Sequence, residues 1–262
     1  MPSAYLFDLD GTLYTDAGPV PGAVEALERL QQARIPFRYI TNTSRRSRAA
    51  IVERLRSYGF PAAAGQVMTS VLAAAELVRR RGHRVVAPFV APQALPDLGE
   101  FELVGGTSGV APGSTSPDAV IIGDLAEGWS YGLLQEAFRA VMGGADVIAL
   151  SRDRYWLRGD GLALDAGPFV AAIEFATGIS ARVAGKPSRD FFEAAIRSLG
   201  LGADRSVAEI AVVGDDVWAD VQGAQGCGLR GWLVRTGKFR AEALAASGIT
   251  PDRILESVAT II

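Results

Sequence analysis

Short apolar runs alternate with helix-like segments along most of this chain of 262 residues. Phe37 to Ile40 and Ile210 to Val213 have the composition of strands, whereas residues 22–33 and 190–199 repeat apolar side chains at helical spacing. Such alternation is typical of a parallel sheet covered by helices. We therefore predict an α/β fold whose core is a doubly wound, Rossmann-like parallel sheet.

The first predicted strand ends in a pair of acids. Its apolar run starts at Tyr5 and is broken by Asp8 and Asp10, which Gly11 follows. Further predicted strands are followed by polar groups: Thr41 with Asn42, Lys186, and Asp215 with Asp216. Open α/β sheets bind ligands at the carboxyl ends of their strands, so we expect these groups to form one site.

The residue types at these strand ends suit phosphoryl chemistry. Clustered carboxylates are the oxygen ligands that Mg²⁺ prefers. A lysine and a hydroxyl beside the metal suit an anion with several oxygens, such as a phosphoryl group. A carboxylate is also a nucleophile towards phosphorus and gives an aspartyl phosphate.

The middle of the chain has a different texture from its two ends. From residue 83 to about residue 180, Pro/Gly-rich irregular sequence is mixed with a separate strand–helix alternation. We predict a core domain from 1–82 and 181–262, and a smaller inserted α/β domain from 83–180. Within the insertion we predict a loop over Gly159 to Gly167. We predict another loop at Gly123–Asp124, which follows an apolar run just as Gly214–Asp215 does but belongs to the inserted domain.

Composition excludes several classes of protein. The net charge of −3 and the pI near 5.4 give no general attraction to nucleic acid or to anionic membranes. Cys227 is the single cysteine, which fits a reducing compartment. The sequence shows neither a bilayer-length apolar run nor the pattern of a signal peptide. We therefore expect a cytoplasmic protein with a small-molecule substrate.

Four segments in order carry a family resemblance: DLDGTLY from Asp8, TNTS from Thr41, GKP from Gly185 and GDDVWAD from Gly214. They resemble the four motifs of haloacid dehalogenase superfamily phosphatases. The long insertion resembles the α/β cap of the subgroup that includes NagD-type nucleotidases and phosphoglycolate and pyridoxal phosphatases. The stretches RYWLRGDGLALDAGPFVAAIEFATG and GAQGCGLRGWLVRTGKFR look closest to the phospholysine, phosphohistidine and inorganic pyrophosphate phosphatase group and its hydrolase-domain relatives.

The resemblance implies a role for each motif residue. Asp8 would be the nucleophile and Asp10 the general acid and base. Mg²⁺ would be held by the Asp8 carboxylate, the Asp10 carbonyl and Asp215. The other implied roles are phosphate binding for Thr41, Asn42, Thr43 and Lys186, and support of the metal or of Lys186 for Asp216 and Asp220.

The inserted domain is expected to exclude water and to choose the leaving group. Its candidate substrate contacts are Tyr155, Trp156, Arg158 and Asp160. Relatives often dimerise through this domain, so a homodimer is expected by analogy. The phospholysine-directed enzyme itself carries a serine where this chain has Asp10, so the resemblance does not imply its narrow substrate preference.

Other activities remain open at this point. The resemblance favours hydrolysis of small phosphomonoesters, with pyrophosphate or phosphoamino acids as further substrates. A phosphomutase would use the same fold. A phospho-accepting receiver-like signalling module also uses a phosphorylatable aspartate, a hydroxyl and a lysine, although its acid pair and its acceptor lie on different strands.

Overall fold

The computed structural model describes residues 1–111, 115–158, 161–202 and 206–261. The chain divides into two compact units, which we describe separately. The first unit comprises Met1–Thr41, Ala49–Met68 and Lys186–Ile262, and the second comprises Asn42–Arg48 and Thr69–Gly185. Within the described residues, none of the helices has the length and apolar character that a bilayer crossing requires.

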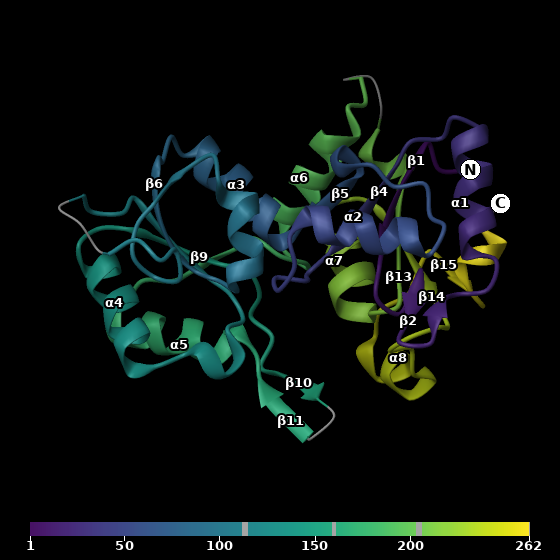
Figure 1. Cartoon of the computed structure of the whole chain (residues 1–262). Helices are drawn as coiled ribbons and strands as arrows, with labels where there is room; N and C mark the ends of the chain where they lie inside the picture. The colour runs from purple at the N-terminus through teal and green to yellow at the C-terminus, as the bar shows by residue number, and fades with distance from the viewer. Residues whose placement is uncertain (112–114, 159–160, 203–205, 262) are drawn as a thin grey trace. The chain divides into compact units, whose positions relative to one another are not determined.

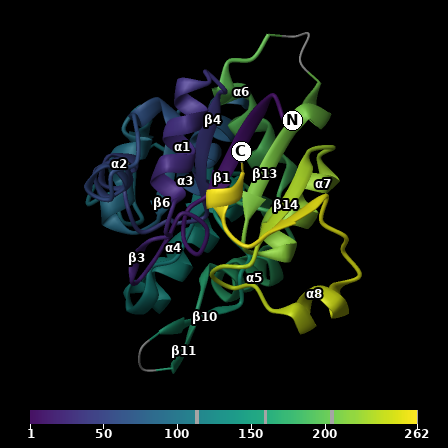
Figure 2. The ribbon, with the colours of Figure 1, turned by 90° about the vertical axis from the view of Figure 1, so that its right-hand side faces the viewer.

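The first unit is built on a six-stranded sheet with the strand order β15-β14-β13-β1-β4-β5. The pairings of β1 with β13 and β4, and of β14 with β13 and β15, are all parallel. Figure 2 shows β1 between β4 and β13. The strands are β1 (Ala4–Asp8), β4 (Phe37–Thr41), β5 (Val67–Thr69), β13 (Ile210–Gly214), β14 (Arg230–Val234) and β15 (Arg253–Leu255), and β2 (Tyr14–Thr15) and β3 (Gly18–Pro19) form a separate antiparallel pair.

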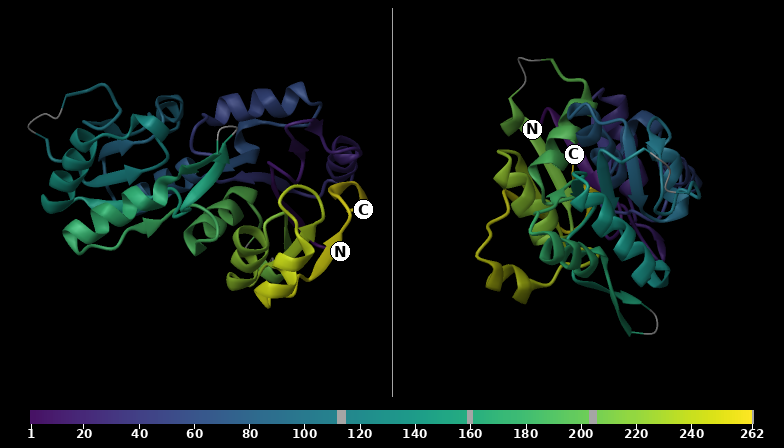
Figure 3. Two further views of the ribbon diagram at one scale, coloured as in Figure 1. Left: turned by 90° about the horizontal axis from the view of Figure 1, so that it is seen from below. Right: turned by 90° about the vertical axis from the view of Figure 1, so that its left-hand side faces the viewer.

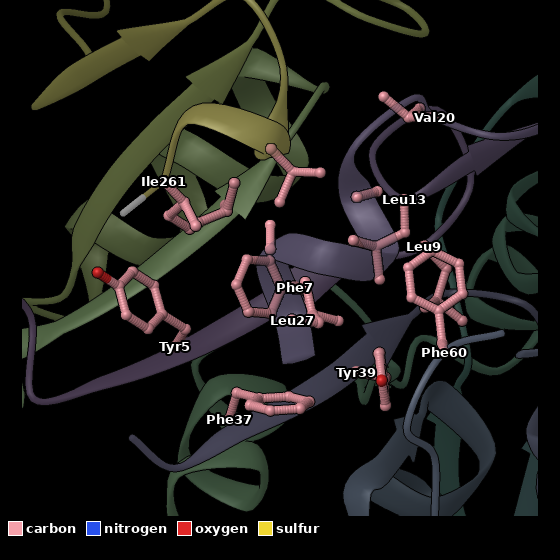
Figure 4. Close-up of a cluster of buried hydrophobic side chains, with 14 of the residues drawn as sticks. Tyr5, Phe7, Leu9, Leu13, Val20, Leu27, Phe37, Tyr39, Phe60 and Ile261 are labelled. Atoms are coloured by element: carbon pink, nitrogen blue, oxygen red, sulfur yellow. The ribbon is translucent and has the colours of Figure 1, made fainter. Parts of the chain in front are cut away.

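Helices lie on both faces of this sheet. On one face, Tyr5 and Phe7 of β1 pack with Phe37 of β4 and with Leu27 of α1 in a cluster of buried side chains (Figure 4). On the other face, Val221 lies directly against the backbone of Gly231 in β14. The helices are α1 (Ala23–Gln32), α2 (Arg48–Ser57), α6 (Arg189–Leu199), α7 (Gly223–Gly226) and α8 (Ala241–Ser247).

Burial on both faces explains the apolar strand sequences. Every residue of β1 is buried, as expected for a parallel strand with helices on either side. Each large apolar side chain that is removed from water here contributes about 1.5–3 kcal/mol. The two termini lie close together in this unit (Figures 1 and 3).

The second unit has its own five-stranded parallel sheet, with the order β12-β9-β8-β6-β7. Side chains of α4 and α5 pack on one face of it against Phe89, Val120 and Ile122, and Figure 1 shows the two helices side by side. The strands are β6 (Val85–Phe89), β7 (Glu102–Leu103), β8 (Ala119–Ile122), β9 (Asp146–Ala149) and β12 (Arg182–Val183), and the helices are α3 (Ser70–Arg80), α4 (Tyr131–Met142) and α5 (Ala166–Thr177).

The predicted α/β class, with a parallel core sheet and a second, smaller α/β body, is confirmed. The long segment of the second unit begins at Thr69 and ends at Gly185, so α3 belongs to the second unit. The sequence boundaries at 83 and 180 differ from these positions by 5 to 14 residues, and the domain division stays a prediction.

The predicted loop over Gly159 to Gly167 is wrong for its described part. β11 (Gly161–Leu164) pairs antiparallel with β10 (Tyr155–Arg158), and the hairpin extends from the unit in Figure 1. Most of β11 is exposed. A strand that buries neither face needs no alternation of apolar and polar residues, so the sequence pattern did not indicate it. Asp165 then caps α5, with its Oδ1 accepting the Ala166 N–H at 2.6 Å.

Candidate active site

The carboxyl ends of three neighbouring strands bring candidate residues together. Asp8 ends β1, Thr41 ends the adjacent β4, and Asp215 directly follows β13 on the other side of β1. The register pairs Asp8 with Ile40, the residue before Thr41. All three candidate side chains are buried. The sheet order therefore brings together residues that are more than 200 positions apart in the chain.

Lys186 binds two of the acids. Its Nζ donates to Asp8 Oδ1 at 2.5 Å and to Asp220 Oδ1 at 2.7 Å. Lys186 immediately precedes the turn into α6, where the Ser188 hydroxyl accepts the Phe191 N–H. The lysine is only 6% exposed, so its ammonium group depends on these carboxylates instead of water.

Negative charge is in excess at this site. Ligand oxygens of Asp8, Asp215 and Asp220 all lie within 4.8 Å of one another. Three carboxylates and the one Lys186 ammonium leave two negative charges when all four groups are ionised. Burying like charges together is unfavourable, so the site favours either protons or a cation.

The pKa values of the three acids reflect this excess. Burial, opposed by Lys186 and supported by Asp215, raises the pKa of Asp8 to about 6. Burial likewise raises the pKa values of Asp215 and Asp220 to about 6. Burial alone would lower the pKa of Lys186, but Asp220 and Asp8 outweigh it and raise that pKa. Lys186 therefore stays protonated.

The donor set fits a divalent cation with oxygen ligands. Asp220 is already engaged through both oxygens, because Oδ1 accepts Lys186 and Oδ2 accepts the Asp216 N–H at 3.2 Å. Asp8 Oδ2 and Asp215 Oδ1 have no hydrogen-bond donor among the described residues. These two atoms are the best placed of the six carboxylate oxygens to bind a metal.

Asp10 differs from Asp8 in its surroundings. Its side chain is exposed, and it is not part of the convergent acid group. The Gly11 N–H donates to Tyr14 O at 2.7 Å, which fixes the peptide plane between Asp10 and Gly11. Because the carbonyl of a trans peptide points away from its N–H, the Asp10 carbonyl points away from Tyr14. The side chain and the carbonyl of Asp10 are thus free for separate tasks.

Asp216 organises the segment that carries Asp220. Its Oδ1 accepts the N–H groups of Trp218 and Ala219, both at 3.0 Å, at the start of a π-helical turn over Val217–Gln222. Its Oδ2 is 3.3 Å from Lys238 Nζ. Burial would raise the pKa of Asp216, but these N–H groups and Lys238 lower it. This turn places the Asp220 carboxylate within hydrogen-bond distance of Lys186 Nζ.

The remaining candidates belong to the second unit. Asn42 and Thr43 line a shallow depression together with Arg45, Asp124 and further polar residues of that unit. Tyr155 is an exposed residue of β10. Asp160 lies outside the described residues, as do the side chains of Trp156 and Arg158.

Sequence reasoning missed one segment of the site. The backbone N–H of Lys238 donates to Asp215 Oδ2 at 2.6 Å, and the Thr236 hydroxyl donates to the Gly11 carbonyl at 2.5 Å. These residues follow β14, in a Gly-containing turn that was not singled out as functional. The Thr-Gly-Lys sequence after a strand was the signal available.

Comparisons with known proteins show to which proteins this chain is similar. A family model described as haloacid dehalogenase-like hydrolase matches residues 5–102, and one described as HAD-hydrolase-like matches 183–261. The chain is 42% identical over 238 residues to the rat (Rattus norvegicus) haloacid dehalogenase-like hydrolase domain-containing protein 2, covering 91% of this chain and 86% of the relative.

Two further proteins extend the comparison. The chain is 37% identical over 245 residues to the bovine (Bos taurus) phospholysine phosphohistidine inorganic pyrophosphate phosphatase, covering 90% of this chain and 83% of the relative. The solved p-nitrophenyl phosphatase from Archaeoglobus fulgidus superposes with a TM-score of 0.87 at 26% identity, covering 99% of this chain and 98% of that one.

Proposed function

This chain belongs to the haloacid dehalogenase-like hydrolase family, and we propose that it is a Mg²⁺-dependent phosphatase of small phosphomonoesters. The observation that carries the proposal is that Lys186 binds Asp8, at the end of β1, and Asp220, in the turn that follows β13, and that both acids converge with Asp215. Such a site attracts a cation, and with the cation it attracts a phosphoryl group.

Asp8 is the proposed nucleophile. A carboxylate oxygen of Asp8 attacks phosphorus, and the bond from phosphorus to the leaving oxygen breaks as the Asp10 carboxyl group gives that oxygen its proton. Asp10 then takes a proton from water, whose oxygen attacks the phosphoaspartate. The bond between phosphorus and Asp8 breaks, so inorganic phosphate leaves and the Asp8 carboxylate is restored.

Other groups hold the phosphoryl oxygens and the cation. Lys186 neutralises phosphoryl charge, and Thr41, Asn42 and Thr43 donate hydrogen bonds to the phosphoryl oxygens. Asp8, the Asp10 carbonyl and Asp215 would hold Mg²⁺, which would supply charge neutralisation at the phosphoryl oxygens. Asp220 holds Lys186 in place through their 2.7 Å contact.

The test is hydrolysis of p-nitrophenyl phosphate with Mg²⁺ and with EDTA. Asp8→Asn is expected to lower kcat by a factor on the order of 10⁴–10⁶, because no phosphoaspartate can form. Asp10→Asn is expected to lower it by roughly 10²–10⁴, because both proton transfers slow. A near-normal rate for Asp8→Asn at saturating Mg²⁺ would show that the mechanism is wrong.

A substrate panel separates the remaining activities. It should contain sugar phosphates, nucleotides, phosphoglycolate, pyridoxal phosphate, pyrophosphate and phosphoamino acids. Release of inorganic phosphate supports the phosphatase, whereas an isomeric phosphate ester as product indicates a phosphomutase. Stoichiometric phosphorylation of Asp8 without turnover, measured by intact-protein mass after acid quenching, indicates a signalling module.

A further inference from the structure

The turn Thr236–Lys238 contacts three residues at the acid site, which belong to two separate loops. The Thr236 hydroxyl donates to the Gly11 carbonyl at 2.5 Å. The Lys238 N–H donates to Asp215 Oδ2 at 2.6 Å, and Lys238 Nζ is 3.3 Å from Asp216 Oδ2. One short turn after β14 therefore joins the loop that follows β1 to the loop that follows β13.

The close approach of two glycines makes this junction possible. Gly11 and Gly237 both have positive φ, at +85° and +60°. A β-carbon on either glycine would fall on the Asp215 carboxylate, and one on Gly11 would also lie 3.1 Å from the Gly237 Cα. The Asp215 side chain is thus enclosed by backbone, so it has little freedom to choose another rotamer.

We propose that the turn Thr236–Lys238 is a positioning element that presets the metal site, by fixing Gly11 through the Thr236 hydroxyl and Asp215 through the Lys238 N–H. This inference rests on the proposed function for the identity of the cation. Gly11 is pinned at both of its peptide planes, by Tyr14 at its N–H and by Thr236 at its carbonyl. The first of these planes carries the Asp10 carbonyl.

The hydrogen bonds also determine which Asp215 oxygen is available. Because Oδ2 is occupied by the Lys238 N–H, Oδ1 is left to bind the cation. Groups that orient metal ligands in this way typically change metal affinity by about 10–100-fold when they are removed. The Thr236 hydroxyl is the part of the turn that a side-chain substitution can remove while the backbone N–H of Lys238 remains.

The experiment compares Thr236→Val, which removes the hydroxyl, with Thr236→Ser, which keeps it. The Mg²⁺ dissociation constant is measured by calorimetry on metal-free protein without substrate. Thr236→Val is expected to raise it by about tenfold, and Thr236→Ser to leave it within about twofold of the parent value. At saturating Mg²⁺, Thr236→Val should lower kcat for p-nitrophenyl phosphate more than it changes KM.

Thr177→Val is the matched control. The Thr177 hydroxyl donates to the Ile173 carbonyl at 2.8 Å within α5 of the second unit, so the same atoms are removed far along the chain from the acids. This variant should keep the parent Mg²⁺ affinity. A loss of thermal stability in Thr236→Val with unchanged Mg²⁺ affinity would assign the turn a purely structural role and overturn the proposal, as would failure of Thr236→Ser to restore affinity.

The binding readout separates this inference from the proposed function. If the parent protein binds Mg²⁺ but hydrolyses no phosphate ester, the phosphatase proposal fails, while weaker binding by Thr236→Val still supports the positioning role. If the parent protein binds no Mg²⁺, the positioning role is overturned.

Discussion

The two sheets each place a buried aspartate after a strand and a glycine, but the surroundings of these aspartates differ. In the first unit, β13 ends at Gly214 and Asp215 follows. In the second, β8 is followed by Gly123 and Asp124. Both aspartates are nearly inaccessible, at 3% and 6% exposure. The local pattern therefore predicts a buried acid at the carboxyl end of a parallel strand, but it does not predict what that acid does.

Asp124 and Asp215 differ in their ion-pair and hydrogen-bond partners. Asp124 is satisfied at both oxygens, since Oδ2 pairs with Arg45 Nε at 2.9 Å and Oδ1 accepts the Ala126 N–H at 2.7 Å. Asp153 and Asp165 line the same depression, but these three acids do not bring ligand oxygens within 4.8 Å of one another, as Asp8, Asp215 and Asp220 do.

Asp215, by contrast, converges with Asp8 and Asp220, and the one lysine among the described residues that is ion-paired in this group, Lys186, pairs with those two other acids. A converging acid group with unbalanced charge distinguishes a cation site from an ion-paired turn.

The largest expected contrast is catalytic. Asp215→Asn removes a charge that faces the cation, so kcat/KM for p-nitrophenyl phosphate at fixed Mg²⁺ should fall by roughly 10²–10³. Asp124→Asn removes an equally buried charge that is already paired with Arg45, and should cost less than about tenfold. Equal losses in the two variants would break the distinction that we draw between the two sheets.

The contrast also shows what the sequence could and could not predict. The four motifs predicted the family, which the comparisons confirm, and helical spacing predicted helices at residues 22–33 and 190–199, where α1 and α6 lie. These features follow from local periodicity and from motifs that each occupy a few consecutive residues.

Other contacts left no such mark in the sequence. The Thr236 contact with Gly11 joins residues 225 positions apart, and the Arg45 partner of Asp124 is equally invisible to spacing. The β10–β11 hairpin was not predicted, because most of β11 is exposed and it has no buried face of alternating apolar residues. Long-range pairing of single side chains is decided by tertiary packing, which local pattern does not encode.

The next largest expected difference between the two aspartates is in how much Mg²⁺ stabilises the folded protein when each is replaced. A ligand that binds only the folded state adds about 2.7 kcal/mol when its concentration is one hundred times Kd. Mg²⁺ should therefore raise the Tm of the parent protein by several degrees, measured by calorimetric scanning against EDTA. Asp124→Asn should keep this rise and Asp215→Asn should lose most of it. A full rise in Asp215→Asn would mean that the cation binds elsewhere.

The smallest expected effect is the pH dependence of stability in metal-free protein, and its sign differs between the three converging acids of the first unit and Asp118 of the second. The pKa values of Asp8, Asp215 and Asp220 are raised to about 6 mainly by burial, so the folded state binds more protons than the unfolded state between pH 4 and 6. Stability should therefore fall as pH rises through that window.

In the second unit, the pKa of Asp118 is lowered by the N–H groups of Val85 and Arg84, so its contribution is present above the unfolded pKa and is lost on acidification.

Urea unfolding of metal-free protein at pH 5 and pH 7 tests both signs. Asp8→Asn removes one of three crowded charges and leaves Lys186 paired with Asp220. It should therefore be more stable than the parent at pH 7 by about 1–3 kcal/mol, with a smaller difference at pH 5. Asp118→Asn should instead be less stable than the parent at pH 7, because a neutral amide is a weaker acceptor for two N–H groups. If Asp8→Asn is destabilised at pH 7 without metal, Lys186 already balances the site and the excess negative charge that we assign to it is wrong.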